Sequence, residues 1–477
     1  MEKTKVVSLL QSLNDSEWRE LEDFVASPFY NKHPELLTLF SILRTWLAND
    51  QIALKSREDL FKILWPDQVY NAKALTYALS NLNKLASLFL SLQKITHTPL
   101  ALELAALEVY SERNLEKHYA AAKRSISDQL TVPTGSSFDF FRNKARFAET
   151  LDQHHLRQKN RVFDVAIQSA AHDLDTYYYL RRLNLACSML DRQQILKSVY
   201  ETNITEPWII HLKTSSVGQA PIIRLYLDIY QMLSEESEEA HFIHLKNNLE
   251  IYSDQISHHD LTEIYQFAIN YCARKIRKGR EPYVKEALNL YLKGIESRFL
   301  IVDGQLSPWT YANVIKLYLR QKEYDAAQQF IEKFLPFLPE AFQQNAYHYN
   351  LAELFYYTKE QEKAQSHLVK VAYTDLNYYL GARVLLAKIY FETGEEDALA
   401  SLLAAFMMFL QRNKALSHDL KQTYLNFCKI LARIIRTAPA RRAAIRQTIS
   451  NTQLLTDRDW LLSIIKLVED TRAASQP

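Results

Sequence analysis

The chain has 477 residues, and its 57 basic and 55 acidic side chains leave a formal net charge of only +2. Such nearly equal numbers of basic and acidic residues give no overall field that would attract nucleic acid or an anionic membrane. Only 7 glycines and 13 prolines are present, against usual shares of about 7% and 5%. A chain of this length with few helix breakers is expected to form long helices with short joints, arranged as several domains or one elongated array.

The cysteines and the apolar runs indicate the compartment of the protein and argue against a membrane span. Cys187, Cys272 and Cys428 lie far apart and form no CxxC motif, which is typical of a reducing compartment and of small buried side chains. The longest wholly apolar run, residues 402–410, has nine residues, whereas a membrane span needs roughly 20. The apolar start of the chain is broken by polar residues from Gln11 onward, unlike a secretory signal. We therefore expect a soluble, cytoplasmic protein without a membrane partner.

Residues 1–98 form a first helical region, which has more prolines and shorter helical segments than the rest. Two stretches in it, SPFYNKHPEL at residues 27–36 and WPDQVYNAKAL at residues 65–75, share the order proline, Tyr-Asn, helix start. We interpret both as helix joints, because a proline forces the preceding residue out of helical geometry. The region resembles the N-terminal region of uncharacterised bacterial helical-repeat proteins. That resemblance implies a bacterial, cytoplasmic setting and brings no function with it.

Single residues in these joints have expected structural roles. Asn71 should cap the helix that follows it, and Asn31 should form a turn of its own. Phe29 and Tyr30 are expected to fill the gap between two helices.

Residues 99–300 are predicted to form irregular helical hairpins. Apolar residues recur at steps of three and four, without the two-residue alternation of strands, which indicates an all-α fold. The segments at residues 100–130 and 222–252 each consist of a predicted helix, a polar turn and a second helix.

Residues 301–452 show internal repetition. Segments 311–339, 348–376 and 383–411 align on Ala327, Ala364 and Leu399, which are 37 and 35 residues apart. In each, an aromatic-rich helix ends at a polar turn, and a second helix opens with acidic residues. The three segments share apolar and small residues at matching positions: Tyr311, Val314, Tyr318, Ala327, Ile331 and Pro339; Leu351, Ala352, Phe355, Ala364 and Leu368; and Leu386, Ala387, Tyr390 and Leu403.

This pattern resembles the tetratricopeptide repeat, a helix-turn-helix unit of about 34 residues. The repeats are degenerate, because Ile315, Phe334 and Leu399 replace small residues of the pattern. The resemblance implies an α-solenoid of antiparallel helical hairpins. Residues 453–477 are predicted to form a C-terminal capping helix and tail, since terminal repeats need a cover over exposed apolar surface.

The resemblance also implies a binding surface, because the first helix of each such unit lines the concave face. Tyr, Trp and Arg dominate interface energetics. The candidate partner-binding residues at the inward positions are Trp309, Lys316, Arg320, Tyr349, Glu353, Tyr356, Tyr357, Lys388 and Phe391. The alternative is that these tyrosines pack between helix layers with their hydroxyls at the rim.

No catalytic, cofactor-binding or metal-binding residue is assigned. Neither a Walker nor a dinucleotide fingerprint occurs, and no Ser, Cys or His lies in a recognisable nucleophile context. His241 and His244 would share a helix face with Glu238, but no further ligand motif accompanies them. We interpret them as solvated surface residues.

The sequence therefore predicts a non-enzymatic scaffold or adaptor that binds a peptide or helix of a partner protein on its concave face. The alternative is a helical-repeat protein that binds nucleic acid through two basic clusters, at residues 274–280 and 433–446. The second cluster contains Arg433, Arg436, Arg441, Arg442 and Arg446. Such binding would weaken steeply as salt rises.

Overall fold

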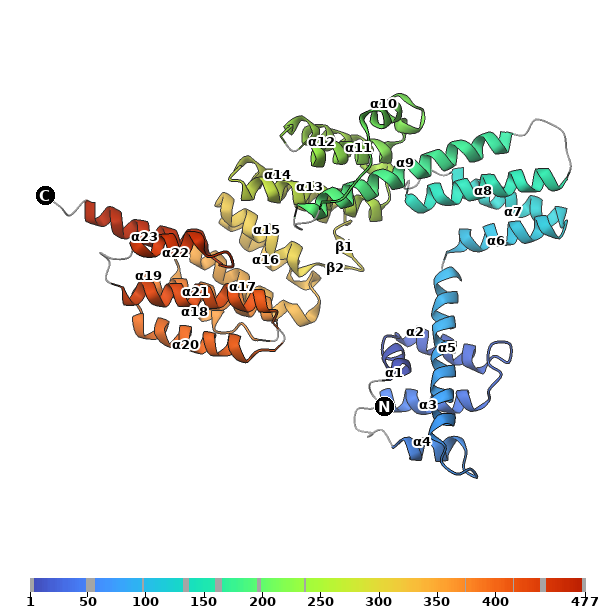
Figure 1. Ribbon diagram of the computed structural model, residues 1–477, viewed down its shortest axis with the longest axis horizontal. Helices are drawn as coiled ribbons and strands as arrows, with labels where there is room; N and C mark the ends of the chain where they lie inside the picture. The colour runs from blue at the N-terminus through green and yellow to red at the C-terminus, as the bar shows by residue number, and fades with distance from the viewer. Residues whose placement is uncertain are drawn as a thin grey trace. The chain divides into compact units, whose positions relative to one another are not determined.

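The computed structural model describes residues 4–48, 56–96, 98–131, 137–158, 165–194, 199–235, 237–373, 375–414, 416–437 and 443–473. Within these ranges the regular structure is almost entirely α-helical, with helices α1 to α23 and one two-stranded hairpin (Figure 1). The all-α prediction is therefore confirmed. No helix in the described ranges is long and apolar enough to cross a membrane.

The chain divides into two compact units, and helix α9 contributes to both. The first comprises residues 1–182 and 205–223, and the second residues 183–204 and 224–477. The first unit contains α1 (Lys5–Leu10), α2 (Asp15–Ala26), α3 (Glu35–Leu47), α4 (Arg57–Leu64), α5 (Ala72–Thr96), α6 (Pro99–Glu112), α7 (Glu116–Thr131), α8 (Phe138–Arg157), most of α9 (Val165–Gln193), α10 (Glu206–Thr214) and the 3-10 turn Val217–Gln219.

The second unit carries the regular C-terminal helices. It contains α11 (Pro221–Ser234, except its first turn), α12 (Glu239–Tyr252), the 3-10 turn Ser253–Gln255, α13 (His258–Arg277), α14 (Pro282–Glu296), β1 (Ile301–Val302), β2 (Gln305–Leu306), α15 (Pro308–Gln321), α16 (Tyr324–Phe334), the 3-10 turn Leu335–Phe337, α17 (Glu340–Tyr357), α18 (Gln361–Leu368), α19 (Leu376–Thr393), α20 (Glu396–Arg412), α21 (His418–Arg436), α22 (Ala443–Asn451) and α23 (Arg458–Ala473). The strands pair antiparallel, with Ile301 opposite Leu306, across a turn in which Asp303 and Gly304 both have positive φ.

Helix α5 packs against α1, α2, α3 and α4 (Figure 1). Its apolar positions recur at steps of three and four, so one face, including Leu75, Leu82 and Phe89, is buried against Leu21 of α2 and Phe40 of α3. At the start of α2, Asn14 and Glu17 form a capping box. This small bundle is the core of the N-terminal region.

The two helix joints of this region are confirmed in most respects. Ser27 ends α2 in extended geometry just before Pro28, the Asn31 side chain accepts from the His33 amide at 2.8 Å, and Asn71 accepts from the Lys73 and Ala74 amides at the start of α5.

The expected role of Phe29 is wrong, and that of Tyr30 holds only in part, because Tyr30 is 39% exposed. Tyr30 stacks on Phe24, with ring centroids 4.1 Å apart, and Phe29 packs edge-on against the outer side of Tyr30. Phe29 is 77% exposed as a result.

Three helix pairs of the second unit share one type of turn. Lys322, Lys359 and Gly394 follow α15, α17 and α19 in left-handed conformation, with φ of 63°, 68° and 77°. In each case the next residue donates its amide to the carbonyl five residues earlier, at 2.8 to 3.0 Å. The anchors aligned in the sequence, Ala327, Ala364 and Leu399, are all fully buried one turn into the following helix. The segments thus repeat the same local structure.

The C-terminal helices build a further core. Leu380 and Val384 of α19 are buried together with Leu403 and Phe406 of α20, Phe427 and Leu431 of α21, Ile445 of α22 and Leu461 of α23. The predicted C-terminal helix is present as α23. It begins at Arg458, and the Thr456 hydroxyl donates to the Asp457 carboxylate at 2.9 Å.

Candidate functional site

A cavity of about 700 Å³ opens on one side of α15, α17 and α19. These are the first helices of the three aligned segments, and Tyr424 of α21 with Thr456 and Asp457 completes the wall. Of the nine residues expected to contact a partner, the cavity brings together seven: Trp309, Lys316, Tyr349, Glu353, Tyr356, Tyr357 and Lys388.

The other two expected residues lie away from the cavity and are held by their own chain. The Arg320 guanidinium donates from Nε to Glu281 at 3.2 Å. The Phe391 ring packs edge-on against Trp460, with centroids 5.6 Å apart.

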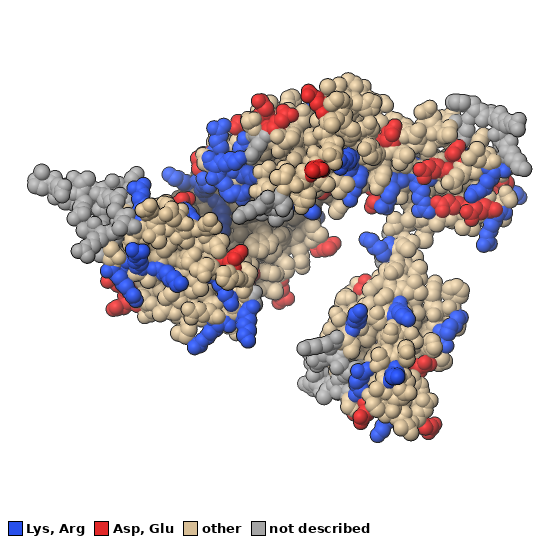
Figure 2. All heavy atoms as spheres, in the orientation of Figure 1, with Lys and Arg blue, Asp and Glu red and all other residues tan. Residues whose placement is uncertain are grey.

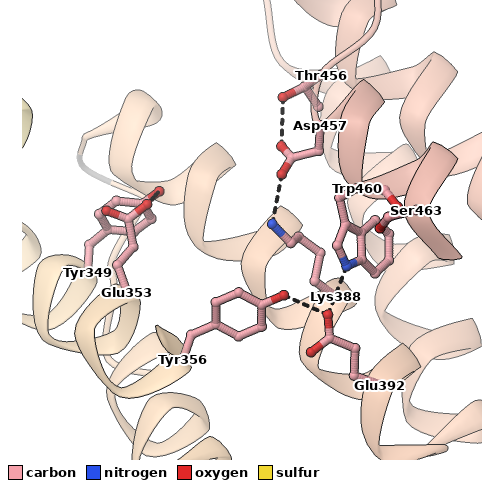
Figure 3. Close-up of polar contacts among 9 residues, drawn as sticks. All are labelled: Tyr349, Glu353, Tyr356, Lys388, Glu392, Thr456, Asp457, Trp460 and Ser463. Carbon is pink, nitrogen blue, oxygen red and sulfur yellow. Dashed lines mark hydrogen bonds and ion pairs between the residues drawn. The ribbon is translucent and has the colours of Figure 1, made fainter. Parts of the chain in front are cut away.

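A polar network joins α17, α19 and the start of α23 beside the cavity (Figure 3). The Lys388 ammonium lies 2.9 Å from an Asp457 carboxylate oxygen. Glu392 Oε1 accepts from the Tyr356 hydroxyl at 2.6 Å and from the Trp460 indole nitrogen at 2.8 Å. Burial, with the hydrogen bond to Glu392, raises the pKa of Tyr356 above its usual value, so its phenol remains a donor.

The Lys388 ammonium also lies over two aromatic rings, 5.2 Å from the Tyr356 centroid and 5.6 Å from that of Trp460. Cations are attracted to the electron-rich faces of such rings. This cation is therefore committed to intramolecular partners.

A second polar pair lies within α17. The Tyr349 hydroxyl donates to Glu353 Oε1 at 2.9 Å, and burial, together with the adjacent Glu353 charge, raises the pKa of Tyr349 well above its usual value. The other carboxylate oxygen, Glu353 Oε2, is buried and has no hydrogen-bond partner among the described residues. Figure 3 shows Tyr349 and Glu353 on the same helix as Tyr356, with their polar ends close together.

Gly381 of α19 permits this arrangement. A Cβ atom at this position would lie 2.9 Å from the Tyr349 hydroxyl and 3.0 Å from its ring. Glycine inside a helix costs about 0.5–1 kcal/mol relative to alanine, so the close approach of Tyr349 supplies a physical reason for it.

The outer part of the cavity is accessible. Trp309 is 66% exposed and Tyr357 is 48% exposed, and Lys316 is also an exposed residue. Exposed aromatic side chains beside a cavity are typical of interaction surfaces.

The first basic cluster is largely engaged within the chain. Arg274 is buried and lies 2.7 Å from Asp191, Lys275 is buried with its ammonium 5.1 Å from the Tyr271 ring, and Arg280 pairs with Glu239 at 2.8 Å. On the face seen in Figure 2, basic and acidic atoms are interspersed, with a local concentration of basic atoms near the turn between α13 and α14.

The second basic cluster is described only in part. Arg433 and Arg436 are exposed in the last turn of α21, where cations are favoured by the helix dipole. Arg446 lies on α22, and Arg441 and Arg442 lie outside the described residues.

The histidine pair His241 and His244 matches the prediction of solvated surface residues only in part, because the His241 side chain is just 19% exposed. His241 lies 3.0 Å from Glu235 and His244 is exposed; in the described part of the chain no group of three or more His, Cys, Asp or Glu side chains could hold a metal ion. The expected burial of Cys187, Cys272 and Cys428 is confirmed. Burial raises the pKa of each thiol, that of Cys428 to about 12, which makes these thiols unreactive.

The sequence did not identify Gly381, Asp457 or Trp460 as parts of this site. Asp457 and Trp460 follow Lys388 and Glu392 by 69 and 68 residues, and only the packing of α23 on α19 brings them together. A glycine just before the third aligned segment was a signal that could have drawn attention to Gly381.

Comparison with protein-family models, with characterised proteins and with solved structures finds no match to this chain. The functional conclusion therefore depends on the geometry of the site.

Proposed function

We propose that the protein is a non-enzymatic scaffold or adaptor: an α-solenoid with tetratricopeptide-like C-terminal repeats that binds a peptide or helix of a partner protein against α15, α17 and α19. The observation that carries this proposal is the single cavity wall formed by the first helices of three aligned segments, with exposed Trp309 and Tyr357 at its edge. Its volume of about 700 Å³ lies within the range of about 300–1,000 Å³ typical of ligand sites.

The charge distribution favours this function over nucleic-acid binding. Three cations of the first basic cluster, Arg274, Lys275 and Arg280, already contact acidic or aromatic groups of the chain. A surface for single-stranded nucleic acid would need free cations interleaved with stacking aromatics along a groove. The cavity instead presents seven aromatic side chains beside charges of both signs, and aromatic residues are enriched at protein–protein interfaces.

The test is partner recovery from a cell lysate by the full chain and by variants. Tyr356 is held by Glu392, so truncating it would also disturb the fold. Trp309 and Tyr357 are better probes because they are exposed. We expect the double variant Trp309→Ala, Tyr357→Ala to lose a protein that the unchanged chain recovers, with no change in helical content.

Tyr373→Ala is the matched control. Tyr373 is 71% exposed and does not line the cavity. Recovery of the same protein by Tyr373→Ala and its loss from the double variant would support the proposal. Equal recovery by all three proteins would reject α15, α17 and α19 as the binding face.

A further inference from the structure

We propose that the Glu353 end of the cavity binds the cationic side chain of a lysine or arginine in the partner peptide. This inference rests on the proposed function and specifies the chemistry of its ligand. The geometry that points to it is a buried carboxylate oxygen, Glu353 Oε2, without a hydrogen-bond partner among the described residues, in a cavity walled by aromatic rings.

The carboxylate is held in place at the cavity wall. Tyr349 fixes the orientation of Glu353 by donating to Oε1 at 2.9 Å, and Gly381 leaves room for the Tyr349 ring. A buried polar atom without a partner is costly, and more so when it carries charge. An ammonium or guanidinium donor would satisfy Oε2 with a charge-assisted hydrogen bond.

The surrounding rings favour a cation as well. Seven aromatic side chains of α15, α17, α19 and α21 line the cavity: Trp309, Phe342, Tyr349, Tyr356, Tyr357, Tyr378 and Tyr424. Their faces attract ammonium and guanidinium groups. The chain already uses this interaction next to the cavity, where the Lys388 ammonium lies 5.2 Å from the Tyr356 centroid.

The other charged residues of the cavity wall also favour a cationic ligand. Three carboxylates and two ammonium groups line the cavity. Asp457 is paired with Lys388, and Asp375 accepts from two backbone amides at the start of α19. Among the described acids of the wall, Glu353 is thus the one with a buried carboxylate oxygen that has no hydrogen-bond partner, whereas Lys316 lies at the exposed edge.

The probe for the test is a phage-displayed library of random peptides, panned on the immobilised full chain. The selected peptides are then synthesised and titrated by fluorescence anisotropy. We expect one lysine or arginine to recur at a fixed position, and its replacement by norleucine or citrulline to weaken binding. We expect Glu353→Gln to weaken binding by about tenfold to a hundredfold, and the norleucine peptide to bind Glu353→Gln and the unchanged chain equally.

Glu362→Gln is the matched control, because Glu362 is exposed on α18 and does not line the cavity. Glu353→Gln keeps the side-chain shape and removes a buried charge, so it should fold; circular dichroism and melting check this. If Glu353→Gln nevertheless fails to fold, the proposal is tested on the unchanged chain alone, by comparing the affinity of the lysine peptide with that of the norleucine peptide.

The outcomes separate this inference from the proposed function. Peptides that lose binding in Trp309→Ala, Tyr357→Ala but bind Glu353→Gln unchanged would overturn the cation site and keep the peptide-binding face. Peptides insensitive to both changes, or the selection of none, would overturn both proposals. Enrichment of acidic peptides that depend on Lys316 would also reject the cation site.

Discussion

The Lys388 ammonium lies 2.9 Å from a carboxylate oxygen of Asp457 and so ties α19 to the segment that enters α23. The side chains are 15% and 29% exposed, so water screens the pair only in part. Asp457→Asn should raise the rate of amide hydrogen exchange in α23, corresponding to a loss of about 1–3 kcal/mol in the free energy of local opening. Asp459→Asn, at an exposed site in the first turn of the same helix, should have a smaller effect. Equal effects would show that the ion pair does not hold α23.

Gly381→Ala should have opposite effects with and without the Tyr349 ring. In the unchanged chain the new methyl group meets that ring, so we expect a loss of about 1–3 kcal/mol in the free energy of unfolding. In a Tyr349→Ala background the clash is absent, and alanine should stabilise α19 by up to about 1 kcal/mol. Denaturant unfolding of the four proteins measures both effects. The same effect in both backgrounds would contradict the proposed role of Gly381.

The facing histidines His348 and His367 should make stability depend on pH. Their Nδ1 atoms are 3.1 Å apart, which requires at least one neutral ring as acceptor. Burial lowers the pKa of both below 6.5, and nearby Lys370 acts in the same direction.

The sign follows from proton uptake by the unfolded chain. Because its histidines have the higher pKa, it binds more protons, so this stability is fully present above about pH 6.5 and is lost as pH falls through the folded pKa values. We expect the melting temperature to fall between about pH 7.5 and about pH 5.5. The fall should be smaller in the double variant His348→Gln, His367→Gln. His154, whose pKa is also lowered by burial, is unchanged in that variant, so a part of the pH dependence should remain. An unchanged slope would exclude a contribution from the pair.

Arg274 and Arg277 lie in one basic segment but should respond differently to truncation. The Arg274 and Asp191 side chains are 8% and 15% exposed, so Arg274→Ala leaves a largely buried carboxylate without its cation and should cost about 3–5 kcal/mol. Arg277 is exposed, and Arg277→Ala should change stability by at most about 0.5 kcal/mol. Thermal unfolding compares the two. A large effect at Arg277 would mean that the exposed cations are structural as well.

The helices and the inner positions could be predicted because both depend on local periodicity. Apolar residues at helical spacing and the aligned anchors Ala327, Ala364 and Leu399 placed seven of the nine expected residues around one cavity. The sequence could not show that Arg320 and Phe391 do not line the cavity. Their partners in the structure, Glu281 and Trp460, are distant in sequence.

The remaining misses have the same origin in tertiary packing. Which of Phe29 and Tyr30 stacks on Phe24 depends on tertiary packing across the joint, and sequence patterning carries no information on that choice. Likewise, lysines occupy the left-handed positions at 322 and 359, where glycine is the usual signal. Of these three positions, only 394 has glycine, the residue type from which such a turn is predicted.

These left-handed turns have a consequence for engineering the protein. They close the helix pairs at the C-terminal ends of α15, α17 and α19, and none of their residues lines the cavity. A lysine in this conformation costs about 1–2 kcal/mol compared with glycine. Lys322→Gly would relieve that strain at the end of α15, whereas Lys359→Gly would also remove an ammonium that lies 5.7 Å from the ring centroid of Tyr356 in the cavity wall. The turn after α15 can therefore be stabilised without changing a side chain that lines the cavity.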